Sequence, residues 1–570
     1  MSAIAVKRRP LRIGWDVTLQ CLALLLLLAI PLALLVTSAL NVGDPQQIPA
    51  KEFGLDNFAR LGIHVDWIRN TLIIASFGTL IATALGVLLA WILYRTTLPG
   101  RRIFDILLAI PYPLGPLVGA LAWNELGAPS GGLINEAFTA LTGLDGPIIN
   151  TSSMTGIILV MAIFEAPVAV LMIGAAMQRM DPTLEECSSV FGGGRARTAF
   201  KVTLPLMLPA ILSAALFLFV SMLGAFAIPA ILGAGARIQV ITTGIYSLFQ
   251  GYPPDYPAAA ALGLLIIGLT ASLVWLNSWV LRGRSYVVVS GKNYRPRQID
   301  MGRWTWLLFA FISLYALVSL ILPIATLLMF SLQSTSSVSW DVSTWTLGNY
   351  RYVIFDFPTT RAAIVNSLLL GVGTGIVGAL AATLIAWTVH RSPSRGRKFL
   401  EQVAMLPQAF PHIIFAFGFL WTILILPIQG LYGSLIALLI AYVILFIPLG
   451  YRSIAGVIVQ IDKSLEESAR VSGASWSRVM RTVTVPLLRG GLVATWALLF
   501  MVSVREVSAS VFLSGPDSQV LGPAILNFWD SGGLPRVSAL AMVQAVIVLA
   551  ALLVIRLVTS GETRVAEPAK

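Results

Sequence analysis

The chain has 570 residues, of which 57% are hydrophobic and only 11% are charged, and its formal net charge is +12. Soluble domains carry about 25% charged residues, so this composition excludes a soluble enzyme, a disordered chain and a fibrous repeat. Two cysteines and three widely separated histidines exclude a disulfide framework and a metal cluster built from those residues. Most of the surface must therefore face lipid.

Twelve charge-poor segments along the chain are long enough to cross a bilayer, which requires about 20 apolar residues in a helix. The third and ninth contain several prolines, which kink a helix. The first is too long for the apolar part of a signal peptide, so we expect an uncleaved span. The sequence predicts an all-α integral membrane protein with spans near 17–40, 70–94, 104–124, 152–178, 207–229, 258–281, 304–331, 366–389, 399–425, 433–451, 490–513 and 537–558.

The basic residues are concentrated on one side of these spans. Of the 38 Lys and Arg residues, 30 lie in loops on the side of the N-terminus, 7 lie in the opposite loops and one, Arg505, lies inside a predicted span. The positive-inside rule then places both termini in the cytoplasm. Because topology explains the positive charge, we expect contact with membrane lipid and no nucleic-acid partner.

The chain repeats itself once in the same orientation. Asn70-Thr-Leu-Ile matches Asn366-Ser-Leu-Leu at an offset of 296 residues, and Asp181-Pro-Thr-Leu-Glu-Glu matches Asp462-Lys-Ser-Leu-Glu-Glu at an offset of 281. Each half holds six predicted spans, and because six is even both halves cross the membrane in the same direction. Parallel repeats are related by an axis along the membrane normal, with a pathway expected at their interface. We place the two transmembrane repeats at 1–290 and 291–570.

Two polar segments lie at equivalent places, between the fourth and fifth spans of each half. Each begins with an aspartate that is a good helix N-cap, and two glutamates in the first turn favour the helix dipole. A glycine then ends the short helix, and a second helix runs toward a proline. The sequence predicts a helix–turn–helix elbow in each half, whose marked residues are Glu185, Glu186, Gly192 and Pro205 in the first copy and Glu466, Glu467, Gly473 and Pro486 in the second.

These segments resemble the EAA loop of binding-protein-dependent ABC importer permeases. The family pattern is Glu-small-small, three residues, Gly, nine residues, then aliphatic-x-aliphatic-Pro. It reads Glu186-Cys-Ser…Gly192…Val202-Thr-Leu-Pro205 here, and the segment from Glu467 to Pro486 follows it too. The cysteine is a mild departure from the family's small residues. The resemblance implies that the short helix is a coupling helix, which docks into a groove of an ATPase subunit, and that the residues marked above serve this coupling. It assigns the contact itself to Glu186, Gly192, Glu467 and Gly473.

The chain has no ATP-binding motif of its own. No G-x-x-x-x-G-K-[ST] loop is present, and the G-x-G-x-x-G match at Gly373–Gly378 lies inside an apolar span, where it indicates close helix packing. We therefore expect a transporter subunit with no catalytic residue and no cofactor, whose ATP is bound by a partner. With two loops in one chain, the resemblance implies two ATPase copies, a periplasmic solute-binding protein and a bacterial inner-membrane location. An ion-coupled secondary transporter and a passive channel are the alternatives.

Three ionisable residues inside predicted spans are candidates for a pathway, because charge in the membrane is costly. Glu165 lies midway along the fourth span, and Arg505 and Glu506 lie in the outer half of the eleventh. They either make inter-helix contacts or line the route of the solute. Their equivalents in the first half are Gly224 and Ala225, so any role of Arg505 and Glu506 is asymmetric.

The substrate is suggested by resemblance alone. The segment Arg505-Glu-Val-Ser-Ala-Ser-Val-Phe-Leu-Ser-Gly-Pro resembles the same region of fused two-domain permeases of ferric-iron importers, and Ile241–Gln250 and Gly522–Trp529 fit that group as well. The resemblance implies transport of ferric iron; related permeases handle thiamine, phosphonates, polyamines or sulfate. No His/Tyr/carboxylate cluster appears, so we expect no metal site in this chain.

Overall fold

The structure is a computed structural model that describes residues 14–565, except 46, 48–49, 145, 179, 182, 281–297, 336–341, 427 and 429. The repeat boundary at 290/291, most of the basic linker between the halves and both chain termini lie outside the described residues. Within the described ranges the chain is helical, and its extended pairings are three isolated bridges. The prediction of an all-α membrane protein is confirmed.

Among the described residues, ten helical segments are long and apolar enough to cross a membrane, and they coincide with ten of the twelve predicted spans. Six of them lack an internal break, and a single π-helical turn or a short 3₁₀ helix joins the parts of the other four. The helices that form them are α1 (Trp15–Ala39), α3 (Val65–Arg95), α8 (Met154–Gln178), α11 (Leu204–Leu223), α14 (Tyr256–Val280), α15 (Trp304–Ala316) with α16 (Leu322–Leu332), α18 (Pro358–Arg391), α21 (Leu435–Gln460), α24 (Val485–Val504) and α27 (Leu534–Val565).

The third and ninth predicted spans are broken helices. The first is α4 (Arg101–Ala109) and α5 (Pro111–Leu114) followed by α6 (Pro116–Gly127), with a bend of 98°. The second is α19 (Arg397–Met405) followed by α20 (His412–Ile425), with a bend of 102°. The bends fall at Gly115, whose φ is +93°, and at Pro411, which occupies the same place in the repeat. A left-handed glycine and a proline both end a helix.

The fifth and eleventh spans end earlier than predicted. Helix α11 stops at Leu223 and α24 at Val504, so Arg505 and Glu506 lie just beyond a helix end and not within the outer half of a span. The reason is local: a glycine follows α11, and after α24 the Glu506 carboxylate accepts the N–H of Ala509, which starts a new turn. Short helices follow in both halves, namely α12 (Ala227–Ala236) and α13 (Ile241–Gln250), then α25 (Ser510–Leu513) and α26 (Leu521–Asp530).

Small residues set the packing inside each half. Helix α3 packs along α8 and α11, and its counterpart α18 packs along α21 and α24. A Cβ on Gly86 of α3 would lie 2.2 Å from the Cβ of Ala169 on α8, and one on Gly450 of α21 would lie 3.0 Å from the Cβ of Ala382 on α18. Gly86 and Ala382 are repeat equivalents, as are Ala169 and Gly450. Each half therefore pairs one glycine with one alanine, but the helix that carries the glycine differs between the halves. In both halves the two helices can approach closely.

The glycine motif in α18 has the packing role expected from the sequence. A Cβ on Gly375 would lie 2.7 Å from Trp496, and one on Gly378 would lie 2.8 Å from Leu499, both on α24. These glycines let α18 and α24 approach closely, which is how small residues stabilise helix pairs in lipid.

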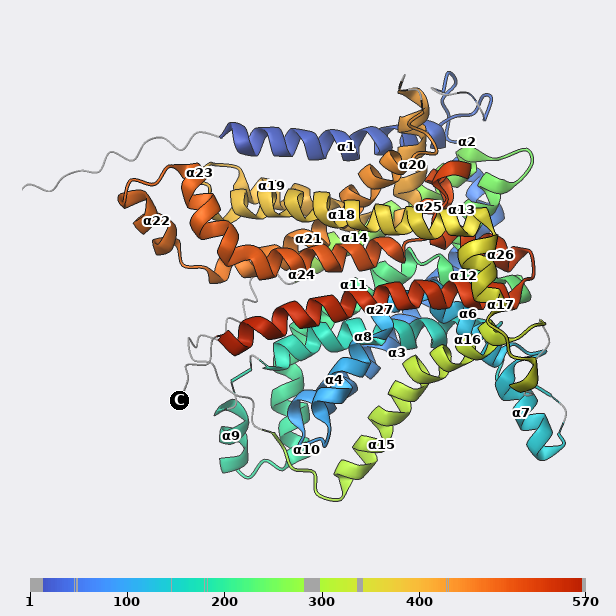
Figure 1. The fold of residues 1–570 in the computed structure, drawn as a ribbon, viewed down its shortest axis with the longest axis horizontal. Coiled ribbons are helices and arrows are strands. Elements are labelled where there is room, and N and C mark those ends of the chain that lie inside the picture. Colours follow the sequence, from blue (N-terminus) through green and yellow to red (C-terminus); the bar gives the residue numbers. More distant parts are fainter. Residues whose placement is uncertain are drawn as a thin grey trace, which may run out of the picture.

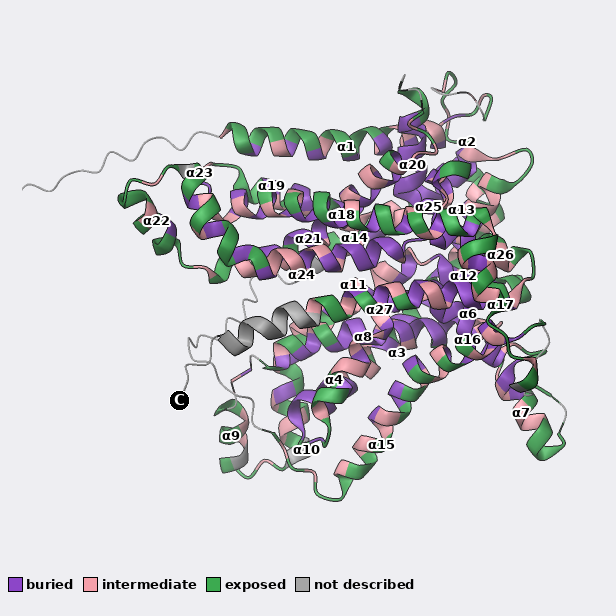
Figure 2. Ribbon diagram, viewed as in Figure 1, coloured by how far each residue is buried: buried purple, intermediate pink, exposed green. Residues whose placement is uncertain are grey.

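The first span of each half reaches across to the other half. Helix α1 packs against α14 of its own half and α20 of the second, and α16 packs against α27 and against α6 of the first. Buried residues fill the centre of the bundle, whereas α1 and α15 expose apolar side chains along their outer faces (Figure 2). The two halves thus form one interlocked unit with a lipid-facing surface.

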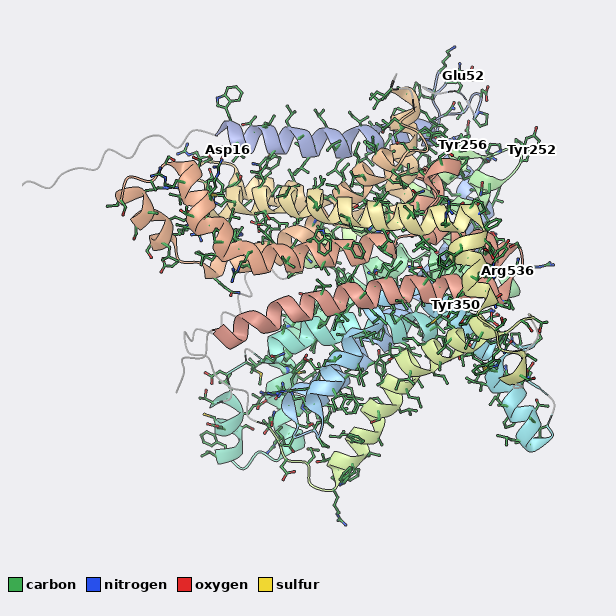
Figure 3. The ribbon with its side chains drawn as sticks, in the orientation of Figure 1. Asp16, Glu52, Tyr252, Tyr256, Tyr350 and Arg536 are labelled. Atoms are coloured by element: carbon green, nitrogen blue, oxygen red, sulfur yellow. The ribbon has the colours of Figure 1, made fainter. Side chains whose placement is uncertain are left out.

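The two elbows lie at the same end of the molecule (Figure 1). The first consists of α9 (Thr183–Val190) and α10 (Arg195–Thr198), and the second of α22 (Lys463–Val471) and α23 (Trp476–Val479). We call this the elbow end. The opposite, far end carries α2 (Asp56–Arg60), α7 (Leu133–Thr142), α13 and α26 (Figure 1). Figure 3 marks Asp16 at the elbow end and Glu52, Tyr252 and Arg536 at the far end.

Candidate functional site

Each elbow has the helix–turn–helix geometry that the sequence predicts. The carboxylate of Asp181 accepts the N–H of Thr183, and that of Asp462 accepts the N–H of Ser464, both at 2.9 Å. Hydrogen bonds from Ser464 hold the pKa of Asp462 below its usual range, because they favour the ionised carboxylate. The turns then pass through Gly192 at φ +76° and through its repeat equivalent Gly473 at φ +84°. An L side chain is unfavourable in this left-handed conformation, so both marked glycines have a geometric role.

The marked prolines lie where each elbow continues into a membrane helix. Pro205 and Pro486 lie in the first turns of α11 and α24, directly after single π-helical turns at Ala199–Thr203 and Met480–Thr484. A proline lacks the N–H that would complete an α-helical bond, and a widened turn accommodates its loss. The two elbows therefore continue into the fifth and eleventh spans through the same backbone irregularity.

The two glutamates of each marked pair point to different surroundings. Glu186 and Glu467 are exposed, whereas Glu466 is buried and the Glu185 side chain is only 11% exposed. Apolar side chains stand exposed beside Glu186 and Glu467. We call this set the elbow surface; it comprises Leu184, Glu186, Val190, Phe191 and Gly192 in the first half and Leu465, Glu467, Val471 and Gly473 in the second.

The inward glutamates form matching ion pairs that sequence reasoning missed. Glu185 pairs with Arg95, the last residue of α3, and Glu466 pairs with Arg391, the last residue of α18. The two arginines are 296 positions apart, which is the offset of the repeat in that region. The repeat could therefore have identified the two arginines as equivalent residues. What the sequence did not show is that each arginine meets a glutamate far along the chain.

A cavity of about 300 Å³ lies between the two halves. Its walls come from α5, α6, α8, α11 and α12 of the first half and from α20, α21 and the end of α24 in the second. The bend residues of each half meet the end of the opposite fifth span: a Cβ on Gly115 would lie 3.1 Å from Arg505, and one on Gly224 would lie 2.9 Å from Pro411. These two contacts are related by the repeat, so the cavity lies at the predicted interface of the halves.

All three predicted pathway residues line this cavity, together with His412 and Arg452. The Nδ1 of His412 lies 2.8 Å from the Glu506 carboxylate. Arg505 donates to the carbonyl oxygen of Tyr112, and its guanidinium lies 4.3 Å from the centre of the Tyr112 ring, so it joins the two halves. The structure brings together charges that lie far apart in the sequence, and His412 carried no sequence signal.

Glu165 is the acidic residue that the first half contributes to the cavity lining. One carboxylate oxygen accepts the hydroxyl of Ser221 at 3.1 Å, and the other has no hydrogen-bond partner among the described residues. Within those residues no group of three or more His, Cys, Asp or Glu side chains could hold a metal ion. The cavity can therefore contact a charged solute without the geometry of a resident metal centre.

Comparison with known families identifies the class of protein. The model for the family described as "Binding-protein-dependent transport system inner membrane component" matches residues 82–286 and 375–562, which together exceed half of the chain. The chain belongs to this family. It is the permease subunit of an ABC importer and not an enzyme, with two family units fused in one multi-pass inner-membrane protein. This membership excludes the secondary transporter and the passive channel, and permeases of this family work with an ATPase and a periplasmic binding protein.

Three relatives show how the permease compares with named proteins. It is 27% identical over 519 residues to the "Ferric transport system permease protein FbpB" of Actinobacillus pleuropneumoniae, which covers 88% of this chain and 72% of that protein. It is 26% identical to the "Probable ABC transporter permease protein y4fN" of Sinorhizobium fredii, with 84% of each chain covered. The "Molybdenum transport system permease protein ModB" of Escherichia coli is 30% identical over 212 residues, which cover 37% of this chain and 90% of ModB. The predicted resemblance to ferric-iron permeases is confirmed.

Proposed function

We propose that this permease carries ferric iron across the inner membrane through the cavity between its halves. The observation that supports this most directly is that the relatives named for ferric transport match across both halves, with 88% and 80% of this chain covered in two cases. The matches to the molybdenum and the spermidine/putrescine permeases cover only 37% and 39% of this chain, which is less than the length of one repeat.

The chemistry of the cavity supports a charged solute. Two carboxylates, Glu165 and Glu506, reach it from opposite halves, and oxygen ligands suit a hard cation. A translocation route must bind its ion strongly enough to admit it and weakly enough to release it. A cavity with a few separated carboxylates fits that requirement better than a cluster of ligands would.

Uptake by the complete transporter tests the substrate. The permease, its ATPase and its cognate binding protein are reconstituted in vesicles and supplied with radioactive ferric iron, molybdate or spermidine. We expect ATP-dependent accumulation of iron alone. Accumulation of molybdate or spermidine without iron would overturn the substrate and leave the importer class intact, and phosphonate, thiamine and sulfate are the next solutes to assay.

A substitution in the cavity tests the pathway. Glu506→Gln removes a charge that faces the cavity and disturbs the pair with His412, so we expect a lower uptake rate at unchanged ATPase association. Asp105→Asn is the matched control, because Asp105 lies on α4 outside the cavity and its bond from the Tyr94 hydroxyl needs only an oxygen acceptor. If Glu506→Gln transports as well as this control, the cavity is not the route.

The elbow surfaces are our proposed docking sites for two ATPase copies, one on each elbow. Two apolar surfaces of equivalent residues lie at one end of the molecule, as two identical partners require (Figure 1). This end would then face the cytoplasm together with both termini, in agreement with the distribution of basic residues, and the binding protein would deliver solute at the far end. ATP binding would close the ATPase pair and change the affinity of the two halves for the solute.

Co-purification tests this docking. We expect Leu184→Asp combined with Leu465→Asp to lose most of the ATPase from the purified complex, because each change puts a charge in an apolar contact. Leu144→Asp, an exposed leucine at the far end, is the control and should retain the ATPase. Full retention of the ATPase by the double variant would show that the elbows are not the docking sites.

A further inference from the structure

In each half, one carboxylate joins the elbow to two membrane helices. In the first half Glu185 lies on α9, and its Oε1 atom accepts the Thr203 hydroxyl at 2.6 Å and contacts the guanidinium of Arg95. Thr203 is the last residue before α11, and Arg95 is the last residue of α3. The coupling helix, the fifth span and the second span therefore meet at one oxygen atom.

The second half repeats this arrangement. Glu466 Oε1 accepts the Thr484 hydroxyl at 3.2 Å and lies 3.7 Å from Nε of Arg391. Arg391 also donates to the carbonyl oxygens of Ile458 and Ile461, at 3.0 and 2.6 Å, where α21 ends. The sequence carries all three members of the cluster at repeat-equivalent positions in both halves. The same three-residue cluster at the same topological place in both halves indicates a functional role.

Burial makes these pairs unusual. The Arg95 side chain is fully buried, and the side chains of Arg391 and Glu466 are less than a tenth exposed. A buried ion pair contributes little net stability, because removing two charges from water offsets their attraction. An apolar contact would hold the elbow against the bundle at least as well. What the ion pair adds is a fixed, directional link between defined atoms.

We propose that Glu185 and Glu466 are positioning residues that transmit the displacement of the coupling helices to the membrane helices. The proposal rests on the docking of the ATPase at the elbow surfaces. Each coupling helix is joined to the bundle by its two backbone connections, and the carboxylate adds a side-chain link directly to α3 or α18. Because these helices pack along both α8 and α11, or along α21 and α24, a displacement of the elbow moves the half as a unit. Within each Glu-Glu pair, the first glutamate links the elbow inward and the second faces the partner.

The double variant Glu185→Gln with Glu466→Gln tests the link in the complete transporter. Glutamine keeps the size of the side chain and an oxygen acceptor for the threonine, but it loses the charge that binds the arginine. Asp105→Asn is again the matched control, because it removes a carboxylate at the same end without touching an elbow. The quantities measured are the amount of ATPase bound, its basal rate, its stimulation by loaded binding protein and the solute uptake per complex.

We expect the double glutamine variant to retain the ATPase while stimulation and uptake per complex fall by roughly tenfold, within the range of known coupling energies. Unchanged stimulation and uptake would overturn the proposal. So would a loss that only follows a smaller amount of folded, ATPase-bound complex, since that is the result of a structural role. If the docking proposal itself is wrong, the aspartate variants of Leu184 and Leu465 will keep the ATPase, and the two failures are thereby told apart.

Discussion

The glycine–alanine contact between α3 and α8 offers a direct test of how the halves are built. In the first half the small residue is Gly86 and the methyl group belongs to Ala169; in the second half Ala382 carries the methyl group and Gly450 is the small residue. The two halves thus make the same close contact with the glycine and the alanine exchanged. We predict that Gly86→Ala destabilises the permease and that adding Ala169→Gly restores it, because the double variant reproduces the second half.

The magnitude follows from the distance. A methyl group on residue 86 would lie 2.2 Å from the Ala169 Cβ, whereas two carbon atoms need about 3.5–4.0 Å. Helices α3 and α8 must separate by more than ~1 Å, and overpacking of this kind costs about 1–3 kcal/mol. The higher helix propensity of alanine, at most about 1 kcal/mol, offsets only part of that cost. We expect a net loss of about 2 kcal/mol, of which the second substitution recovers at least half.

Unfolding of the purified permease in mixed detergent micelles, followed by circular dichroism, measures these differences, and iron uptake reports the effect on transport. Gly268→Ala is the control, because apart from its chain neighbours and the backbone of its own helix no atom lies within 4 Å of the position where its Cβ would stand. The reasoning is refuted if Gly86→Ala is as stable as Gly268→Ala, or if the double variant is no more stable than Gly86→Ala alone.

Three further predictions concern the elbows and the contact between the halves. Gly473→Ala forces a side chain into φ +84°, which should lower the stability of the elbow by about 1–2 kcal/mol and weaken ATPase association in a pull-down assay. Gly456→Ala, whose added methyl group meets open space, should leave the elbow's stability and the ATPase association unchanged. Arg505→Lys should transport more slowly than the wild type, because an ammonium group does not reproduce the stacking of the guanidinium on Tyr112; equal uptake would contradict this. Because the pKa of Asp462 is lowered in the folded protein, its cap stabilises the second elbow fully at pH values above the usual aspartate pKa. This stabilisation is lost as the pH falls through the lowered pKa. Asp462→Ala should therefore weaken ATPase binding at neutral pH and have almost no effect in strong acid.

The permease class could be predicted from the sequence because the residues that carry the family resemblance are close together in the chain and recur at a fixed offset. Span length follows from bilayer thickness, and the elbow follows from an aspartate cap, two glutamates and a glycine within a dozen residues. The exact repeat offsets predicted two equivalent halves, and the structure confirms that arrangement in the packing of α3 and α18. Broken helices were predicted less well: prolines marked the third and ninth spans, but the bend at Gly115 depends on a backbone conformation that composition does not specify.

Composition and periodicity by themselves determined that this protein lies in the membrane, repeats once and carries two polar elbows, since these properties depend on residues close together in the chain. Only the tertiary structure decided which charges meet. Arg95 and Glu185 lie 90 positions apart, and His412 and Glu506 lie 94 apart. Whether they touch depends on the rotation and spacing of packed helices, which small residues such as Gly86 set through contacts that no local pattern records. The same physics placed Arg505 beyond a helix end, where it reaches across to Tyr112 and joins the two halves at the cavity.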